Sequence, residues 1–460
     1  MTHAPRQTVI LFGAHRWSSE RYIGDAEAAG LRVVLAVASR DNEGVSPSLR
    51  QRVHAVIRMP PEDEPERLAR LVGELNDDYG PGWLVLSLDD YVGEEAVRLS
   101  EAGGSRYLSR AAEEDTRCKH LMRARWNRFC ARNPDLRLCP VPYSFRAFTD
   151  FGGARRLRER DESPEFAECA GPFIVKPDEM AGSIEVRRAE SADSLDSTVG
   201  EVLDGLRGKW LAAAGHHGVR VRPRVQVEWE IPRSAGLPGH PHAEFSAEFL
   251  SEGGRHHLLG VTQKWVSESF LEVGHVFPAE SLPPSLLHDL RGAVEGLLAE
   301  LGVWYGVSHW EFIVTPDERL ALVETQMRPA GDRIMQLVEF ATGAHPIRAL
   351  LAWMAGKGFD PLLFRPSRSA AICFLAPERP VGRVRDVQAD PGIESLCREW
   401  WVDLEALADT DWHGPTGWAD RYAWVVSTGP DIHEARGRCR EAAAHLRMIG
   451  ERGETRLAVP

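Results

Sequence analysis

The sequence has 460 residues and a formal net charge of −13, with 43% hydrophobic and 27% charged residues. This length predicts several domains around a sizeable core, and the composition is that of a globular protein. Because the chain is acidic and has no basic stripe, we expect no nucleic-acid partner. No apolar run approaches about 18 residues, so we expect no membrane segment.

The seven cysteines (118, 130, 139, 169, 373, 397 and 439) are scattered and form no CxxC pair. The first residues, MTHAPRQTV, are polar and do not resemble a signal peptide. Free thiols are typical of a reducing compartment, so we expect a cytoplasmic protein without disulfides or a cysteine zinc site.

The N-terminal part alternates strands and helices. Residues 8–14, 32–39 and 83–90 read as strands, and residues 20–30 and 93–103 read as helices. This order predicts a parallel sheet with both faces covered. The first turn, GAHRWSS, lacks the GxGxxG fingerprint, so we interpret residues 1–110 as a Rossmann-like domain without a dinucleotide, which disfavours a hydride-transferring enzyme.

Further along the chain, residues 158–171 and 231–243 have the composition of loop-like insertions. Apolar residues at helical spacing predict a helix over 286–302 that ends at Gly302. After Pro366 a further α/β unit follows, with strands at 370–375 and 421–427. The last helix is expected over 431–450, with Asp431 as its cap.

The end of one predicted strand carries polar side chains. Glu324, Gln326 and Arg328 follow the apolar residues 321–323, and alternate residues of a strand share a face. Residues 307–314 place His309 and Glu311 on one face of another strand. If the strands are neighbours, two glutamates converge, which favours a hard cation such as Mg²⁺. The alternative is a strand-end salt bridge between Glu324 and Arg328.

Lys176 ends the apolar strand FIV, before a turn that contains Gly182 and Ser183. A buried lysine needs a partner, and a small-residue loop lets backbone N–H groups approach phosphate oxygens. The pattern therefore predicts a phosphate site, against the alternative of a surface hairpin. Lys119 taken alone reads better as a solvated helix lysine.

Taken together, these segments resemble the ATP-grasp superfamily, and within it the L-amino-acid ligases. The resemblance covers residues 110–350 in order and spacing and extends to both ends of the chain. It is carried by RCKHLMR around Lys119, PFIVKP with the loop 178–184, VQVEWEI, AEFSAEF, HWEF and ETQMRPAGDRIMQLVEFATG.

The resemblance implies an α/β architecture: an ATP-grasp fold with an N-terminal Rossmann-like domain and a C-terminal α/β appendage. The implied domains are 1–110, the subdomain 111–228 with the lid loop, the core 229–365 and the lobe 366–460. It also implies ATP and Mg²⁺ as cofactors, with two ions expected and Mn²⁺ as another suitable ion.

The resemblance assigns roles to single residues. Lys119 and Lys176 should hold the phosphates and the adenine side of ATP, and Ser183 should also bind the nucleotide. Residues 226–231, with Glu228 and Ile231, should hold adenine at a hinge, and Glu244 should bind ribose. Glu311, Glu324 and Gln326 should hold the metal, and Arg328 and Lys176 should serve the phosphoryl transfer. Glu272 and His275 in LEVGHVFPA, with Arg328 and Gly331, should contact the substrate, the alternative being that Glu272 and His275 lie on a loop surface.

The sequence departs from the family pattern in two places. The third metal position is usually Asn, and here it is Gln326, which is one methylene longer. The second departure is the insertion 232–243, which separates the hinge from Glu244.

The implied reaction activates an amino-acid carboxylate as an acyl-phosphate, which an amine attacks to give an amide, ADP and phosphate. Two alternatives stay open, a carboxylase that activates bicarbonate and a non-catalytic nucleotide-binding protein. The substrate pair is not determined by the sequence, and the acceptor could be another amino acid, another amine or a carrier-protein thiol. A homodimer is also left open.

Overall fold

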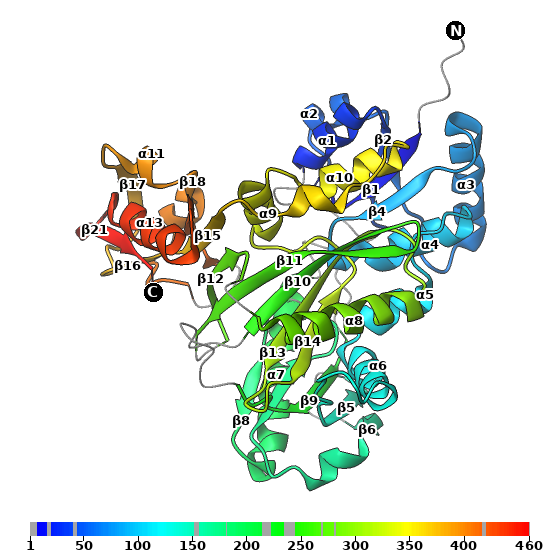
Figure 1. The fold of residues 1–460 in the computed structure, drawn as a ribbon, viewed down its shortest axis with the longest axis horizontal. Helices are drawn as coiled ribbons and strands as arrows, with labels where there is room; N and C mark the ends of the chain where they lie inside the picture. The colour runs from blue at the N-terminus through cyan, green and yellow to red at the C-terminus, as the bar shows by residue number, and fades with distance from the viewer. Residues whose placement is uncertain are drawn as a thin grey trace.

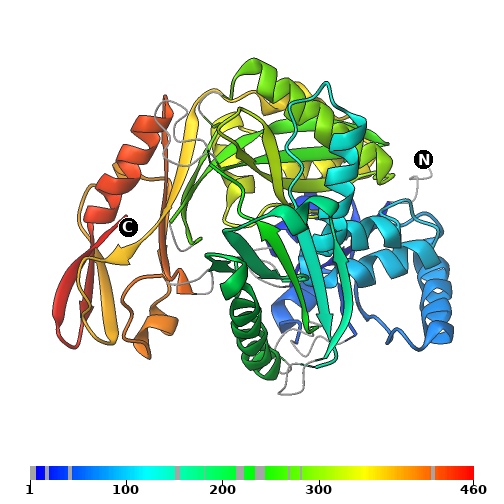
Figure 2. The same ribbon diagram turned by 90° about the horizontal axis from the view of Figure 1, so that it is seen from below.

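The computed structural model describes residues 7–15, 20–39, 44–150, 156–180, 182–213, 222–233, 244–267, 270–279, 282–415 and 420–459. Figure 1 shows three lobes around a central sheet: the N-terminal lobe in blue, a small lobe in cyan and green, and the C-terminal lobe in orange and red. From below, the N-terminal and C-terminal lobes lie at opposite ends of the molecule (Figure 2).

The N-terminal lobe contains a four-stranded parallel sheet, which confirms the prediction. Its order is β3 (Ala55–Arg58), β2 (Arg32–Val37), β1 (Thr8–Phe12), β4 (Leu84–Ser87). All residues of β1 are buried, as expected for a strand covered on both faces. The helices of this lobe are α1 (Arg21–Ala29), α2 (Pro47–Arg52), α3 (Pro65–Tyr79) and α4 (Gly93–Ala102), with the 3-10 helix η2 (Asp90–Val92) after β4.

The small lobe is a five-stranded antiparallel sheet with one long helix, α7 (Ala192–Ala213). The order is β6 (Leu157–Glu162), β5 (Tyr143–Phe148), β9 (Arg224–Trp229), β7 (Phe173–Pro177), β8 (Arg187–Ala189). Helices α5 (Arg110–Arg117) and α6 (Lys119–Arg132) connect it to the N-terminal lobe.

The prediction of a loop over residues 158–171 is wrong. Residues 157–162 form the edge strand β6, paired with β5, and the 3-10 helix η3 (Pro164–Glu168) follows. Five of the six residues of β6 are exposed, so the strand has no apolar face that the sequence could reveal. Charged residues on an edge strand also discourage pairing with other chains.

The central sheet has eight strands, all antiparallel. Its order is β14 (Leu320–Gln326), β13 (Gly306–Val314), β10 (Glu244–Glu252), β11 (Arg255–Val266), β12 (Glu272–Phe277), β15 (Ser369–Phe374), β19 (Ala423–Gly429), β18 (Glu399–Val402). The accompanying helices are α8 (Pro284–Glu300), α9 (Ile334–Thr342) and α10 (Pro346–Met354), with η4 (Pro361–Phe364). Helix α8 confirms the predicted helix, and Gly302 follows it with φ of 67°.

The C-terminal lobe adds a second antiparallel sheet with the order β16 (Ala376–Pro377), β21 (Gly453–Ala458), β20 (Leu446–Gly450), β17 (Val384–Ala389). Its helices are α11 (Ile393–Leu396), α12 (Leu404–Ala408) and α13 (Ile432–Ala444). Asp431 caps α13 by accepting a hydrogen bond from the backbone N–H of Glu434, as predicted.

The last predicted helix is too long, because α13 ends at Ala444 and residues 446–450 form β20. Leu446 and Met448 are both fully buried, which is the alternation of a strand rather than of a helix. Since β12 pairs with β15, the central sheet crosses residue 366, where the last domain is expected to begin. The four expected domain boundaries stay predictions.

Within the described residues, none of the helices combines the length and the apolar character that crossing a membrane requires.

Candidate functional site

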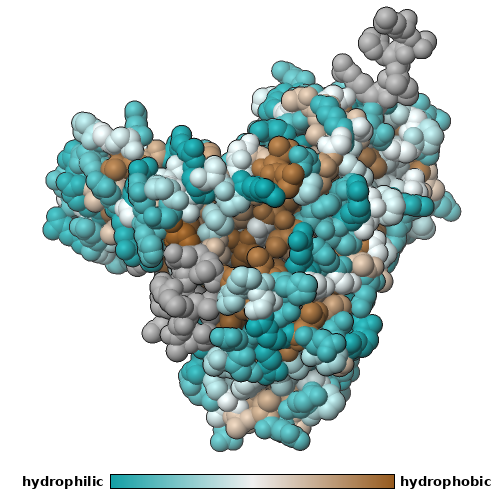
Figure 3. All heavy atoms as spheres, viewed as in Figure 1, coloured by the Kyte–Doolittle hydropathy of each residue, from teal (hydrophilic) through white to brown (hydrophobic). Residues whose placement is uncertain are grey.

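Two neighbouring cavities lie where the lobes meet. In the space-filling view, apolar side chains gather near the centre of the face shown, and hydrophilic residues dominate the rest of that face (Figure 3). We call the first the Lys176 cavity; it is lined by residues that include Lys119, Lys176, Ser183, Glu228, Ile231, Glu244, Glu272, Glu311 and Glu324. We call the second the Arg328 cavity; its lining includes Asp90, Glu113, Arg117, Lys119, Glu324, Gln326 and Arg328. Lys119, Met180 and Glu324 line both.

Glu311 and Glu324 lie opposite each other on β13 and β14, as the sequence predicted for neighbouring strands. The register shifts directly after this pair, because Phe312 pairs with Leu322 and leaves Val323 as an extra residue on β14. Both side chains line the Lys176 cavity, and they are 16% and 19% exposed. Two carboxylates therefore meet in a poorly solvated place.

Cations hold the Glu311 carboxylate. Lys264 donates to its Oε1 at 2.6 Å, and Nε2 of His309 lies 2.9 Å from the same oxygen. Burial alone would raise the pKa of Glu311, but Lys264 and His309 bring this pKa well below its usual value. Burial alone would lower the pKa of His309. The carboxylates of Glu311 and of Glu248, which lies 2.9 Å from Nδ1, outweigh burial and raise the pKa of His309 to about 9. Sequence reasoning missed Lys264, whose only signal is a lysine inside the apolar strand VTQKWV.

Glu324 is paired with Lys119, not with Arg328. The distance from Lys119 Nζ to Glu324 Oε1 is 3.2 Å, and Gln326 Nε2 donates to the same oxygen at 3.0 Å. Lys119 is 5% exposed at the start of α6, so reading it as a solvated helix lysine is wrong. The alternative salt bridge from Glu324 to Arg328 is wrong as well, because Arg328 pairs with Asp90 at 2.6 Å.

Lys176 is a buried lysine with a partner. Its Nζ donates to Glu228 Oε1 at 2.6 Å, and Arg123 donates to Glu228 Oε2 at 2.9 Å. Burial would raise the pKa of Glu228, but Arg123 and Lys176 bring it below its usual value; burial lowers the pKa of Lys176. Sequence reasoning missed Arg123. Its signal is helical spacing, because it lies one turn after Lys119 on α6.

The rest of the Lys176 cavity brings together three other predicted residues. Gly182 and Ser183, in the turn after β7, have φ of 71° and 54°, so the loop backbone is left-handed there. Ile231 and Glu244 line the same cavity and are buried. Burial raises the pKa of Glu244 to about 7. The insertion that precedes Glu244 lies, over residues 234–243, outside the described residues.

The Arg328 cavity lies between the N-terminal lobe and the end of β14. Asp90, in η2 after β4, accepts from Nε of Arg328 at 2.6 Å. Burial raises the pKa of Asp90. Gln326 faces this cavity rather than the Lys176 cavity, and Gly331 is exposed and is not part of either lining. Asp90 was missed by sequence reasoning, since nothing local links it to a residue 238 positions away.

Glu272 and His275 lie on β12 rather than on a loop surface, so the alternative reading of this segment is wrong. The register shifts here, with Gly274 opposite Trp265 and Glu272 opposite Val266. Val273 is thus an extra residue, and Glu272 and His275 both approach Asp332. His275 Nε2 lies 3.1 Å from Asp332, while Glu272 pairs with Lys264 and lies 3.5 Å from Arg421. Lys264 and Arg421 thus pair with the carboxylates of this cluster.

No family model matches the chain, and no curated protein matches it. Solved structures do. An L-amino acid ligase from Bacillus licheniformis aligns with a TM-score of 0.68 over 97% of this chain and 99% of its own, at 18% identity. The biotin carboxylase domain of Hydrogenobacter thermophilus 2-oxoglutarate carboxylase, solved with MgADP, aligns with a TM-score of 0.62. This alignment covers 100% of this chain and 93% of the other, at 15% identity. Phosphoribosylglycinamide synthetase from Anaerococcus prevotii aligns with a TM-score of 0.62 over 96% of this chain and 99% of its own, at 11% identity.

The fold is the ATP-grasp fold. At identities of 11–18% the comparisons establish the architecture.

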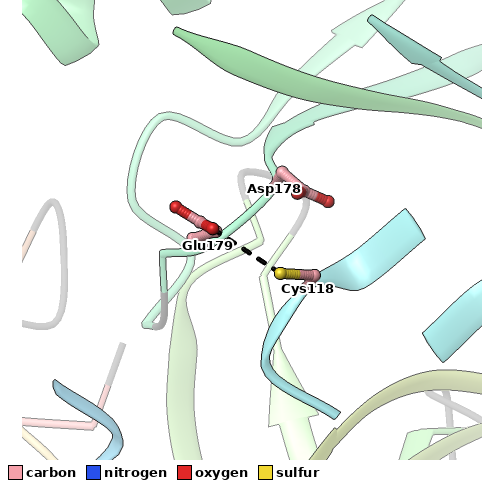
Figure 4. Close-up of side chains that lie close together, drawn as sticks. All are labelled: Cys118, Asp178 and Glu179. Atoms are coloured by element: carbon pink, nitrogen blue, oxygen red, sulfur yellow. Dashed lines mark hydrogen bonds between the residues drawn. The ribbon is translucent and has the colours of Figure 1, made fainter. Parts of the chain in front are cut away.

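One other acidic cluster lies where β7 passes into the loop that contains Gly182 and Ser183. Figure 4 shows Cys118 directed toward Glu179, with 3.5 Å between Sγ and Oε1, and Asp178 beside them. Glu179 Oε1 is also 3.1 Å from Arg117 and 2.8 Å from Arg222. Burial raises the pKa of the Cys118 thiol well above its usual value. A protonated thiol and a glutamate already paired with arginines form a structural cluster rather than a metal site.

Proposed function

We propose that this chain is an ATP-dependent carboxylate–amine ligase that joins an amino-acid carboxylate to an amine, with release of ADP and phosphate. The strongest support is the pairing of Glu311 with Glu324 in a cavity that also contains Lys119 and Lys176. Phosphoryl transfer requires neutralisation of phosphate charge and accurate positioning rather than a protein nucleophile. Two carboxylates and two lysines supply that environment.

The donor set fits a hard divalent cation. Glu311 and Glu324 present carboxylate oxygens from adjacent strands, and the positive charge of Lys264 and His309 keeps Glu311 ionised. These are the oxygen ligands that Mg²⁺ prefers, and Mn²⁺ takes the same kind of ligand. Gln326 would contribute an amide oxygen to a second ion. Bound Mg²⁺ would neutralise charge on the phosphate oxygens.

The other residues of the site would bind the parts of the nucleotide. Lys119 and Lys176 would contact the ATP phosphates, the β9 segment from Glu228 to Ile231 would hold adenine, and Glu244 would bind ribose. The left-handed turn at Ser183 would close over the phosphates and exclude water.

The reaction has two steps. A substrate carboxylate oxygen attacks the γ-phosphorus of ATP, which forms an acyl-phosphate and releases ADP. The amine then attacks the acyl carbon, the C–O bond to phosphate breaks, and the nitrogen loses a proton. Arg328 lines the Arg328 cavity together with Glu324. Its guanidinium would stabilise charge on the transferring phosphate.

A matrix of paired L-amino acids with ATP and MgCl2 tests the proposal, with phosphate release measured and products identified by mass spectrometry. We expect one or a few pairs to give phosphate and a product one water lighter than the pair. Phosphate release that needs bicarbonate and no amine would replace the ligase by a carboxylase. ATP binding without turnover on any pair would indicate a non-catalytic nucleotide-binding protein. A homodimer and a cytoplasmic location stay predictions.

A further inference from the structure

A strained turn follows the strand that carries Glu324. Asp332 and Arg333 are consecutive non-glycine residues with φ of 51° and 61°. This left-handed conformation is unfavourable for residues that carry a Cβ, and it persists only where the surrounding structure holds it. The turn lies between Arg328 and α9, which begins at Ile334. Its geometry therefore affects where Arg328 and the backbone after it are placed.

Residues of the C-terminal lobe hold both side chains of this turn. Arg421 donates to Asp332 twice, from Nη1 to Oδ2 at 2.7 Å and from Nη2 to Oδ1 at 2.5 Å. Arg333 pairs with Glu399, and its guanidinium carbon lies 4.1 Å from the ring centre of Trp424. Parallel bonds between a guanidinium and a carboxylate fix orientation as well as distance.

Arg421 also contacts the candidate substrate residue Glu272. Its Nη1 lies 3.5 Å from Glu272 Oε2, and its guanidinium carbon lies 4.0 Å from the ring centre of Phe374. The side chain of Arg421 is 7% exposed. A planar guanidinium has enough donors to serve two carboxylates at once, which the single ammonium of a lysine does much less well. Lys264 holds Glu272 from another side.

We propose that Arg421 is a positioning residue for the amino-acid substrate: it fixes the Asp332 turn and the Glu272 carboxylate together, so that the C-terminal lobe completes the substrate site. The proposal rests on the proposed ligase function. It assigns Arg421 no contact with ATP, since Arg421 is absent from the lining of the Lys176 cavity in the described residues.

The first test compares Arg421→Met, Arg421→Lys and the control Arg447→Met. Arg447 is also in the C-terminal lobe and pairs with Asp390 at 3.0 Å, away from the site. The probe is the amino-acid pair that releases phosphate fastest in the matrix above. For Arg421→Met we expect the KM for the amino acid to rise at least about ten-fold, with the KM for ATP within about two-fold. Arg421→Lys should be intermediate and Arg447→Met unchanged.

A second variant covers the case in which Arg421→Met does not fold. Asp332→Asn removes the charge that Arg421 holds and keeps a residue that tolerates the left-handed conformation. It should raise the same KM. The double variant Arg421→Lys/Asp332→Asn should be no worse than the worse single variant, because both changes disrupt the same Arg421–Asp332 contact. Folded Arg421→Lys and Asp332→Asn proteins with wild-type KM values would overturn the proposal.

Hydrogen exchange distinguishes failure of this inference from failure of the proposed function. If the wild-type chain releases no phosphate with any pair, the ligase function fails and the substrate role of Arg421 fails with it. If the wild-type chain turns over, backbone amides of residues 329–336 in the nucleotide-free protein should exchange faster in Arg421→Met than in Arg447→Met. Equal exchange in the two variants would overturn the positioning role while leaving the ligase function intact.

Discussion

Glu311 and Glu324 are register partners across β13 and β14, yet each is held by a different cation. Lys264 holds Glu311 and Lys119 holds Glu324. The two carboxylates thus lie side by side in a poorly solvated cavity, each paired with its own lysine, and Glu324 also forms part of the wall of the second cavity.

Replacing Glu324 by Gln should remove a metal ligand while keeping the shape of the side chain. We expect phosphate release to fall at least about a hundred-fold, because charge neutralisation in the transition state is lost. The control is Glu318→Gln, an exposed residue of the turn between β13 and β14. Circular dichroism should show that both variants fold, and full activity in a folded Glu324→Gln protein would disprove the metal assignment.

Lys176→Met should weaken ATP binding about ten- to a hundred-fold, since a charge-assisted contact contributes ~1.5–3 kcal/mol. Arg123 still neutralises Glu228 in this variant, so the fold should survive. Isothermal titration calorimetry with ATP measures the effect, and exposed Lys357→Met is the control. Unchanged affinity together with unchanged turnover would make Lys176 a structural lysine.

Arg328→Gln should reduce both stability and turnover, and the two effects can be separated. The substitution leaves the buried Asp90 without its cation, which should lower the free energy of unfolding by ~1–3 kcal/mol. Protonation of Asp90, whose pKa is raised by burial, limits this loss. Adding Asp90→Asn should restore the melting temperature and leave turnover low. Recovery of turnover in the double variant would show that Arg328 serves the fold and not the phosphoryl transfer.

Glu272→Gln should raise the KM for the amino-acid substrate about ten- to a hundred-fold and leave the KM for ATP nearly unchanged. The physical reason is the loss of a carboxylate that would face the substrate ammonium in the Lys176 cavity. Steady-state kinetics with each substrate varied in turn makes the comparison. Equal changes in both constants, or none in either, would rule out substrate recognition by this residue.

His345 should make the chain less stable in acid. It is buried beside Tyr22, where α10 meets α1, and neither ring nitrogen has a hydrogen-bond partner among the described residues. Burial, with Arg21 and Arg348 nearby, lowers the pKa of His345 to about 2. Between this value and the unfolded pKa of about 6.5 the unfolded chain binds the extra proton, so stability falls as pH falls below about 6.5.

His345→Phe should remove this dependence. Between pH 8 and pH 5 the wild type should lose ~2 kcal/mol more unfolding free energy than the variant, because 1.5 pH units at 1.36 kcal/mol each separate pH 5 from the unfolded pKa. Urea unfolding at the two pH values measures it. His413→Phe, whose histidine is 63% exposed, should lose as much as the wild type. Identical losses in wild type and His345→Phe would contradict the burial argument.

Local patterns predicted a large part of the fold and of the Lys176 cavity. The alternation that placed Glu311 and Glu324 on facing positions needed only strand periodicity and the adjacency of two consecutive strands. The parallel N-terminal sheet followed from its strand–helix order. The edge strand β6 was missed because its burial pattern carries no alternation.

Residues that act across long sequence separations could not be read from the sequence. Asp90 meets Arg328 and Arg421 meets Asp332 because lobes dock, and neither pair has a local signature. The interpretation of Lys119 taken alone was wrong for the same reason, since its ion pair is with Glu324, which is 205 residues away. Helical spacing would have linked Arg123 to Lys119.

The pairing of β12 with β15 has a consequence for how this chain can be divided. Strand β12 carries Glu272 and His275, and β15 opens the C-terminal lobe. A truncation before residue 369 would leave β12 with an unpaired edge and would remove Arg421 as well. A chimera that takes its C-terminal region from another chain with the ATP-grasp fold would therefore have to exchange β12 together with that region.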